Sequence, residues 1–280
     1  MALAVITACI AASTASATFN LRYVALGDSY TAGPAIPNQI ATDVPPGCAQ
    51  SDQNYPHLIA ALLRLADFAD VSCSGARTVD MTQPQVTQVG TNPPQFDALT
   101  PRTRLVTVGI GGNDIGFSMI LGACLTPAPV GQPCQDRFVQ NGVDTLQQRI
   151  DATAPKIAAV LQGINTRSPH AKVLLVGYVD ILPLSGPGCF PQVPLAPADV
   201  PYLNGVEVSL NRMLARTARA NDAEYVDSYR ATIGHDACQT PDVRWVEPLS
   251  PVNPAAPFHP NADGHKAMFK ATLFTLLFDT

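Results

Sequence analysis

The sequence predicts an α/β protein: one three-layer α/β/α domain built around a central parallel sheet of about five strands. Short strand-like apolar runs alternate with segments whose apolar residues follow helical spacing, which is typical of a parallel sheet with crossover helices. The chain has 280 residues, of which 46% are apolar and 14% charged, so it can bury a substantial core. One large domain is favoured over two small ones.

Five apolar runs are expected to form the strands, at residues 23–26, 69–73, 105–108, 172–176 and 224–226. The third run ends in a glycine-rich segment, 109–112, which allows a tight exit from the strand. Helical spacing predicts helices over 55–66, 143–165, 203–221 and 262–278, the second of them interrupted near Pro155.

Four long proline-rich segments, 34–54, 82–101, 182–201 and 241–257, connect these elements. Loops of such length in a compact domain are often walls or lids of a binding site, and most of these follow strands. Their apolar character suits an acyl or alcohol group. Surface loops without any substrate role are an equally good interpretation for each loop taken singly.

The amino terminus resembles a secretory leader. An apolar stretch too short to span a bilayer is followed by an Ala-x-Ala cleavage site ending at Ala17, so residues 1–17 are expected to be removed and 18–280 to form the mature domain. No Lys or Arg precedes the apolar stretch, and a buried N-terminal strand or helix is the alternative. Secretion into the extracellular medium follows from the first interpretation.

Cysteine counting agrees with export. Removal of Cys9 with the leader leaves six cysteines without Cys-x-x-Cys spacing, which favours three disulfides over a zinc site or buried free thiols. Six thiols allow 15 pairings. The preferred one joins sequence neighbours, because it would fasten three long loops: Cys48 with Cys73, Cys124 with Cys134, and Cys189 with Cys238.

Charge argues against several partners. The net charge is -5 and no Lys/Arg cluster is evident, so nucleic acid is not an expected partner. No other apolar run reaches membrane-spanning length, no His/Asp/Glu set has convincing metal-ligand spacing, and no cofactor is expected. The expected partner is a small-molecule or lipid ester, and a monomer is favoured although the sequence does not determine the oligomeric state.

Four separated fragments together supply the groups that acyl transfer needs: residues 27–29 (Gly-Asp-Ser), 74–75 (Ser-Gly), 111–114 (Gly-Gly-Asn-Asp) and 259–261 (His-Pro-Asn). Ser29 follows the first strand, at the sheet edge where α/β proteins bind ligands. A serine hydroxyl needs a base to become nucleophilic, and His259 can supply it. Asn261 is a plausible cap for the last helix, while His265 lies inside that helix and is expected to be structural.

The negative oxygen of a tetrahedral intermediate needs donors already aimed at it. Three are expected: the backbone N–H of Ser29, the backbone N–H of Gly75 and the side-chain amide of Asn113. Asp28 and Asp114 are assigned structural work, accepting hydrogen bonds from nearby backbone N–H groups.

In this order the fragments resemble the blocks of the SGNH (GDSL) hydrolase superfamily, over almost the whole mature chain. The resemblance implies a flavodoxin-like fold, Ser29 as nucleophile, His259 as base, and an oxyanion hole from Ser29, Gly75 and Asn113. Six cysteines and proline-rich loops make the chain similar to the secreted, disulfide-bonded esterases and lipases of actinobacteria.

One position departs from the family pattern. Most members carry an Asp three residues before the histidine, where this chain has Ala256. A Ser–His dyad is therefore predicted, with Nδ1–H of His259 held by a backbone carbonyl of the 254–257 stretch, assigned to Ala256. A carbonyl fixes the tautomer but stabilises imidazolium less than a carboxylate. Glu247, reaching over from its loop, is the competing orienting group.

These observations predict a secreted carboxylic ester hydrolase that acts on neutral, lipid-like esters through an acyl-enzyme. Two alternatives stay open: a carbohydrate acetyl esterase, disfavoured by a single Trp at position 245, and a non-catalytic secreted binding protein of the same fold.

Overall fold

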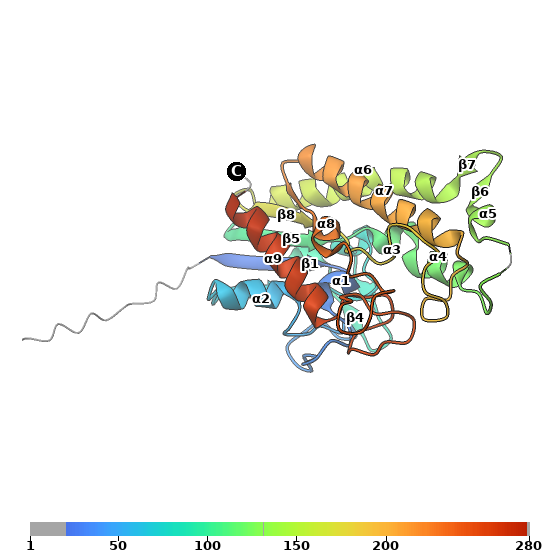
Figure 1. The fold of residues 1–280 in the computed structure, drawn as a ribbon. Coiled ribbons are helices and arrows are strands. Elements are labelled where there is room, and N and C mark those ends of the chain that lie inside the picture. Colours follow the sequence, from blue (N-terminus) through green and yellow to red (C-terminus); the bar gives the residue numbers. More distant parts are fainter. Residues whose placement is uncertain (1–20, 131, 279–280) are drawn as a thin grey trace, which may run out of the picture.

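A five-stranded parallel sheet forms the centre of the computed structural model, which describes residues 21–130 and 132–278 (Figure 1). The strand order is β2-β1-β5-β8-β9, with bounds Phe68–Asp70, Arg22–Gly27, Thr103–Gly109, Lys172–Val176 and Glu224–Val226. The fold class predicted from the sequence is confirmed. The expected leader, 1–17, lies outside the described residues.

Helices cover both faces of the sheet (Figure 1). The pair α6 (Thr145–Arg167) and α7 (Asp199–Arg219) packs together on one face, and α2 (Tyr55–Leu62), α8 (Ser228–Thr232) and α9 (Ala262–Phe278) lie on the other. The strands of the sheet interior, such as β8, are almost fully buried, as expected for a parallel sheet covered on both faces.

Two expectations about these elements were wrong. Helix α6 continues through Pro155 for 23 residues instead of being interrupted there. Proline removes one hydrogen bond from a helix interior, but α6 buries an apolar face that includes Ile150, Ile157 and Leu161, and this packing holds both halves in one helix. The second strand also has other bounds than expected: it ends at Asp70, although the N–H groups of Val71 and Cys73 still donate to the β1 carbonyls of Ala25 and Gly27 at 3.0 and 2.9 Å.

Several short elements occupy segments that the sequence left unassigned. Helices α1 (Ser29–Ala32), α3 (Gly112–Ile115) and α4 (Phe117–Cys124) follow β1 and β5 directly. The other additions are the helix α5 (Gln135–Phe138), the 3₁₀ turns η1 (Thr78–Met81) and η2 (Gln95–Ala98), and the hairpins β3 (Gln85–Val86) with β4 (Thr91–Asn92) and β6 (Val139–Gln140) with β7 (Val143–Asp144).

The order of the strands creates a switch point between β1 and β5. The chain moves from β1 to β2 on one side and then returns to β5 on the other, and both strands end level, with Gly27 paired to Gly109. Ligands of open α/β sheets bind at such a point. Ser29 and Asn113 follow these two strand ends, two and four residues later.

Gly27 is required where β1 turns into α1. Its φ is +151°, and a Cβ atom there would lie 2.3 Å from Oγ1 of Thr31. No L side chain fits this conformation and this close contact. The glycine of the first fragment therefore lets the helix that begins at Ser29 start directly at the sheet edge.

Three disulfides fasten the loops, with the pairing expected from sequence order: Cys48–Cys73, Cys124–Cys134 and Cys189–Cys238. The first ties the 34–54 loop to the chain just before Gly75. The second closes the segment after α4, and the third joins two loops that lie 49 residues apart.

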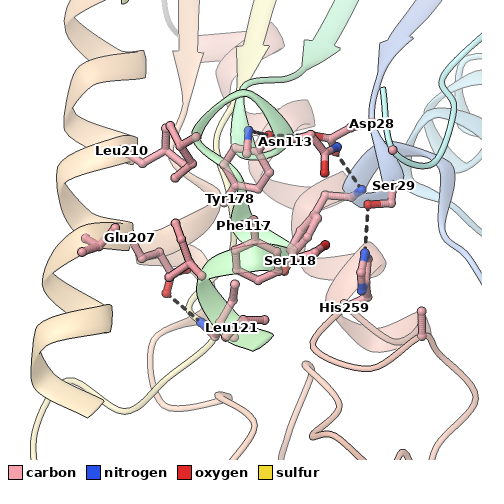
Figure 2. Close-up of a pocket in the computed structure, with 18 of the residues that line it drawn as sticks. Asp28, Ser29, Asn113, Phe117, Ser118, Leu121, Tyr178, Glu207, Leu210 and His259 are labelled. Carbon is pink, nitrogen blue, oxygen red and sulfur yellow. Dashed lines mark hydrogen bonds between the residues drawn. The ribbon is translucent and has the colours of Figure 1, made fainter. Parts of the chain in front are cut away.

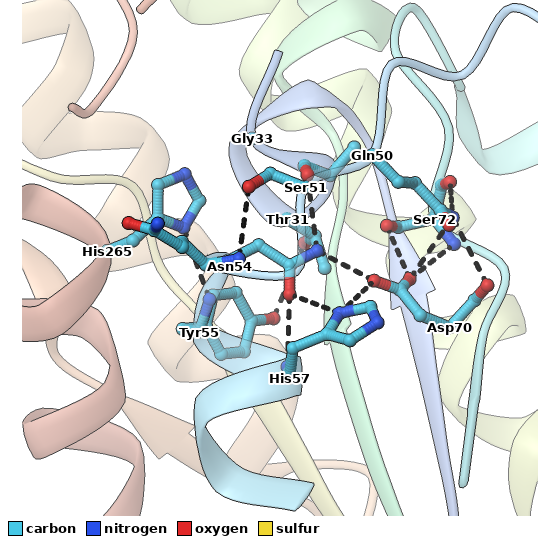
Figure 3. A network of polar contacts seen from close by, with 12 residues as sticks. Thr31, Gly33, Gln50, Ser51, Asn54, Tyr55, His57, Asp70, Ser72 and His265 are labelled. Atoms are coloured by element: carbon cyan, nitrogen blue, oxygen red, sulfur yellow. Dashed lines mark hydrogen bonds and ion pairs between the residues drawn. The ribbon is translucent and has the colours of Figure 1, made fainter. Parts of the chain in front are cut away.

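A buried polar network holds the start of α2 against the sheet (Figure 3). The side chain of Asn54 donates to Ala32 O at 3.1 Å and to Asp70 at 2.7 Å, and it accepts from the N–H of His57 at 3.0 Å. One amide thereby connects the end of α1, the end of β2 and the first turn of α2. Asn54 therefore anchors the end of α1, the helix that begins at Ser29.

Candidate active site

Ser29 and His259 meet at the carboxyl edge of the sheet, although 230 positions separate them (Figure 2). The Oγ of Ser29 lies 2.8 Å from Nε2 of His259. On its other side, Nδ1 of His259 lies 2.8 Å from the carbonyl oxygen of Pro257. Because a carbonyl can only accept, Nδ1 carries the proton and Nε2 is left to accept from the serine hydroxyl.

The orienting carbonyl belongs to Pro257, and the assignment to Ala256 was wrong by one residue. The carbonyl of Ala256 instead accepts from the backbone N–H of His259 at 3.1 Å. Phe258 has a left-handed backbone, with φ of 59°, and this turn brings the ring of His259 over the carbonyl two residues before it. Such a conformation costs free energy for a bulky residue and must be held by its surroundings.

Glu247 does not contact the imidazole. Its carboxylate forms an ion pair with Arg244 at 3.2 Å and accepts from the side chains of Asn261 and Asn253, each at 2.9 Å. Burial alone would raise the pKa of Glu247, but these hydrogen bonds outweigh burial and lower it. Its backbone also pairs with the histidine loop, N–H to His259 O and carbonyl to Phe258 N–H. Glu247 therefore stabilises the loop that carries His259 and does not orient the imidazole ring.

The other two residues of the last fragment have structural positions. Asn261 caps α9, since its Oδ1 accepts from the N–H groups of Asp263 and Gly264 at 3.0 and 3.1 Å. His265 is fully buried inside α9, where its Nδ1 accepts from the N–H of Tyr55 at 3.3 Å. Burial, with a smaller effect from His259, lowers the pKa of His265 to about 3, so it stays neutral.

The three expected oxyanion donors surround one cavity with Ser29 and His259. Among the described residues, the backbone N–H groups of Ser29 and Gly75 donate to no other group. The amide of Asn113 donates one hydrogen to Ala76 O at 2.9 Å, which fixes its direction and leaves the second hydrogen available. Unused donors on a rigid frame are what a developing oxyanion requires.

The two acids of the fragments hold the frame together. Asp28 accepts from the N–H of Tyr30 at 3.0 Å, and Asp114 accepts from the N–H and hydroxyl of Thr78 at 2.9 and 2.5 Å. Burial raises the pKa of Asp28 to about 7, although hydrogen bonds from the hydroxyl of Tyr178 and the N–H of Tyr30 oppose this. Neither carboxylate is bonded to the hydroxyl of Ser29 or to the ring of His259.

Tyr178 was missed by sequence reasoning, although it connects two of the fragments. Its hydroxyl donates to Asp28 at 2.5 Å and accepts from the N–H of Gly112 at 2.6 Å. A Cβ atom at position 112 would lie 3.0 Å from this hydroxyl, so the second glycine of the third fragment makes room for it. Tyr178 follows β8 in a segment without periodic pattern, and no sequence signal singled it out.

An apolar cavity of about 310 Å³ extends from Ser29 toward α7 (Figure 2). Helices α4 and α7 contribute more of its walls than any other element, whereas the long loops contribute Pro34, Leu182 and Ala256. The interpretation of those loops as walls of the site therefore holds only at these positions. The apolar lining from the two helices comprises Phe117, Ile120, Leu121, Leu203, Val206 and Leu210.

Two carboxyl groups line the cavity, Asp28 and Glu207. Glu207 is on α7, and its Oε2 accepts from the N–H of Ile181 at 3.3 Å. Burial, with a smaller effect from nearby Asp180, raises the pKa of Glu207 well above its ordinary value. Burial therefore favours the uncharged form of Glu207 beside the apolar side chains, which suits an acyl chain.

A serine hydroxyl bonded to an imidazole beside unused N–H donors and an apolar cavity defines a serine ester hydrolase on an α/β/α fold. The chain belongs to the GDSL-like Lipase/Acylhydrolase family, whose model matches residues 25–267. It is accordingly a lipase or esterase.

Relatives agree with this assignment. The chain is 40% identical to "Lipase 2" of Streptomyces coelicolor over 277 residues, covering 96% of this chain and 90% of that protein. Among solved structures it is similar to phospholipase A1 from Streptomyces albidoflavus NA297 and to an extracellular lipase from Streptomyces rimosus. Both have a TM-score of 0.75 and 26% identity; coverage is 91% and 90% of this chain and 98% of each relative.

Proposed function

We propose that the mature protein is a secreted ester hydrolase that cleaves lipid-like acyl esters through an acyl-enzyme on Ser29. His259 takes the proton of the serine hydroxyl as it attacks the ester carbonyl, and later returns a proton to the leaving alcohol. The N–H groups of Ser29 and Gly75 and the amide of Asn113 stabilise the negative oxygen. Water, activated by the same imidazole, then releases the acid.

The observation that carries this proposal is the 2.8 Å contact between Ser29 Oγ and His259 Nε2 at the mouth of an apolar cavity. The cavity favours an acyl chain over an acetyl group on a polysaccharide. Trp245, the aromatic residue best suited to stacking on a sugar, instead stacks on His235 with 3.3 Å between ring centroids and does not line this cavity.

Replacement of the nucleophile tests the proposal. Ser29→Ala should abolish both hydrolysis of p-nitrophenyl esters and labelling by a fluorophosphonate, whereas Ser250→Ala, at an exposed serine outside the cavity, should retain both. A chain-length series of esters should show the highest kcat/KM above acetate. Hydrolysis that persists in Ser29→Ala would refute the mechanism.

Secretion rests on the three disulfides and on the leader-like sequence at 1–17. Among residues 21–130 and 132–278, no helix has the length and apolar character needed to cross a bilayer. Expression of the full chain in a secreting host tests this part: the protein recovered from the medium should begin at Thr18. Retention of the intact chain inside the cell would contradict it.

A further inference from the structure

A second groove adjoins the active-site cavity on the far side of Asn113. Its lining shares Asn113 and Ile115 with the cavity and continues between η1, α3 and α6. Three cations line it, Arg77, Arg149 and Lys156. The net charge of the chain is -5, so three cations gathered beside Ser29 and His259 indicate a binding site for an anionic group.

Acidic groups do not neutralise the groove. Asp114 is the acid in its lining, so three cations face one carboxylate and two positive charges are in excess. The carboxylate of Asp114 is 4% exposed and accepts two hydrogen bonds from Thr78, which directs it into the protein. Lys156 lies 3.8 Å from it and is 51% exposed, so its ammonium remains open to the groove.

Two of the cations, Arg77 and Arg149, are attached through the backbone or the side chain to the segments that hold Asn113. Arg77 stands between Ala76, which accepts from the Asn113 amide, and Thr78, which binds Asp114. Its exposed side chain makes no ion pair within the described chain. The guanidinium of Arg149 donates to the carbonyl of Ile115 at 3.3 Å, two residues after Asn113.

The position of Asn113 also separates the two halves of a substrate. When the ester carbonyl oxygen lies against the Asn113 amide, the apolar cavity receives the acyl chain, and the groove on the other side is open to the alcohol half. Apolar side chains accompany the cations there, since Val79 and Met119 are 46% and 70% exposed at its rim. The groove thus suits an amphiphilic alcohol bearing an anionic group.

We propose that Arg77, Arg149 and Lys156 form a subsite for the phosphate of a glycerophospholipid whose acyl ester is cleaved at Ser29. Guanidinium and ammonium groups are the usual protein ligands of phosphate. This inference rests on the proposed function, because it assigns the alcohol side of the same site. Phosphate recognition adds to ester cleavage and is not needed for it.

The test compares kcat/KM for short-chain esters kept monomeric, so that adsorption to a lipid surface has no effect: dihexanoyl phosphatidic acid, dihexanoyl phosphatidylcholine and dihexanoylglycerol. Each of Arg77→Gln, Arg149→Gln and Lys156→Gln should lower kcat/KM for phosphatidic acid about fivefold. Hydrolysis of dihexanoylglycerol should stay within about twofold of the wild type. Arg102→Gln, at an exposed arginine beside the opposite end of β5, is the matched control and should change neither.

Further measurements distinguish phosphate binding at the subsite from docking on a lipid surface. High salt should lower the preference for phosphatidic acid in the wild type and leave the triple Gln variant unchanged. Inorganic phosphate should compete with phosphatidic acid in the wild type and not in that variant. If the triple variant keeps the wild-type ratio of the substrates while its Ser29-dependent activity persists, the subsite proposal fails and the ester hydrolase proposal stands. If the triple variant no longer binds anionic vesicles but keeps the wild-type ratio of kcat/KM values, the three cations dock the protein on a lipid surface. The subsite proposal then fails as well.

Discussion

The hydroxyl of Tyr30 donates a hydrogen bond of 2.6 Å to the carbonyl oxygen of Phe258. The residue after Ser29 is thereby tied to the residue before His259, across 228 positions of the chain. The Tyr30 ring also lies against the imidazole of His259, with 4.8 Å between centroids. The side chain of Tyr30 thus contacts both the left-handed turn at Phe258 and one face of the His259 ring.

Removal of this hydroxyl should loosen the histidine without removing it. Tyr30→Phe keeps the ring but leaves the Phe258 carbonyl without its donor, at a cost of about 1–3 kcal/mol. We expect kcat for p-nitrophenyl butyrate to fall about tenfold while KM changes little, because the variant keeps the aromatic ring that lines the cavity. Tyr202→Phe, which removes a hydroxyl bonded to Asp144 away from the site, is the matched control. Equal kcat in both variants would argue against a positioning role.

Tyr178 should matter for the oxyanion hole and not for the base. Tyr178→Phe leaves the N–H of Gly112 and the carboxyl of Asp28 without their shared partner, and helix α3, which carries Asn113, loses one of its attachments. Loss of an oxyanion donor costs about 3 kcal/mol, and partial misplacement should lower kcat about tenfold or more. Stopped-flow acylation rates should fall, whereas the pH dependence of kcat/KM should keep its wild-type midpoint. A shifted midpoint would instead indicate that Tyr178 acts on His259.

The sequence was sufficient for the parts of the site that follow strand ends. Parallel strands deliver their carboxyl ends to one edge, so Ser29 and Asn113 could be placed together from β1 and β5 alone. The pairing preferred among the 15 possible ones is confirmed, because each bridge closes a loop between cysteines that are neighbours in sequence.

The local geometry of the site could not be predicted from the sequence. The shift of the orienting carbonyl from Ala256 to Pro257 depends on one left-handed residue, Phe258, whose type does not favour that conformation. The walls of the cavity were missed because α4 is only eight residues long and apolar on nearly all sides, so its spacing shows no clear period. Tyr178 depends on contacts from three separate segments, which no local pattern encodes.

The pH dependence of catalysis should reflect an imidazole without a carboxylate partner. Burial lowers the pKa of His259 below its ordinary value of about 6.5, and the hydrogen bond to Pro257 opposes this only in part. The base is therefore neutral and active above that range, and kcat/KM should rise with pH along a single limb centred below about 6.5. Ala256→Asp restores the family's carboxylate and should move this limb upward. An unshifted limb in a fully folded Ala256→Asp variant would show that position 256 cannot reach the ring.

Substitutions at the α7 end of the cavity should change the preferred length of the acyl chain. Leu210 lines the cavity on the side away from Ser29 (Figure 2). Leu210→Trp fills this end, at a packing cost of about 1–3 kcal/mol, and should move the best p-nitrophenyl ester to a shorter chain while the acetate rate is kept. Leu210→Ala should move it the other way. Identical chain-length profiles in both variants would mean that acyl chains do not run toward α7.

Buried carboxyl groups should make the fold less stable as pH rises. Asp28 has a pKa of about 7, and burial raises that of Glu207 well above its ordinary value, so both hold a proton more tightly in the folded state than in the unfolded chain. Their contribution is fully present below the ordinary carboxyl pKa of about 4 and is lost as pH rises through the folded values. From Asp28 alone, the free energy of unfolding should fall by on the order of 2 kcal/mol between about pH 5.5 and pH 8. The hydrogen-bonded Glu247, whose pKa is lowered, acts in the opposite sense and only below about pH 4.5.

Glu207→Leu separates this effect from a general response to pH. Leucine cannot ionise and suits the apolar lining, so the variant should match or exceed the wild-type thermal midpoint at about pH 8 and show a flatter dependence on pH. Asp136→Asn, at an exposed carboxylate, should follow the wild-type curve. Parallel curves for all three proteins, measured by calorimetry at matched ionic strength, would show that Glu207 ionises as easily in the folded protein as in the unfolded chain.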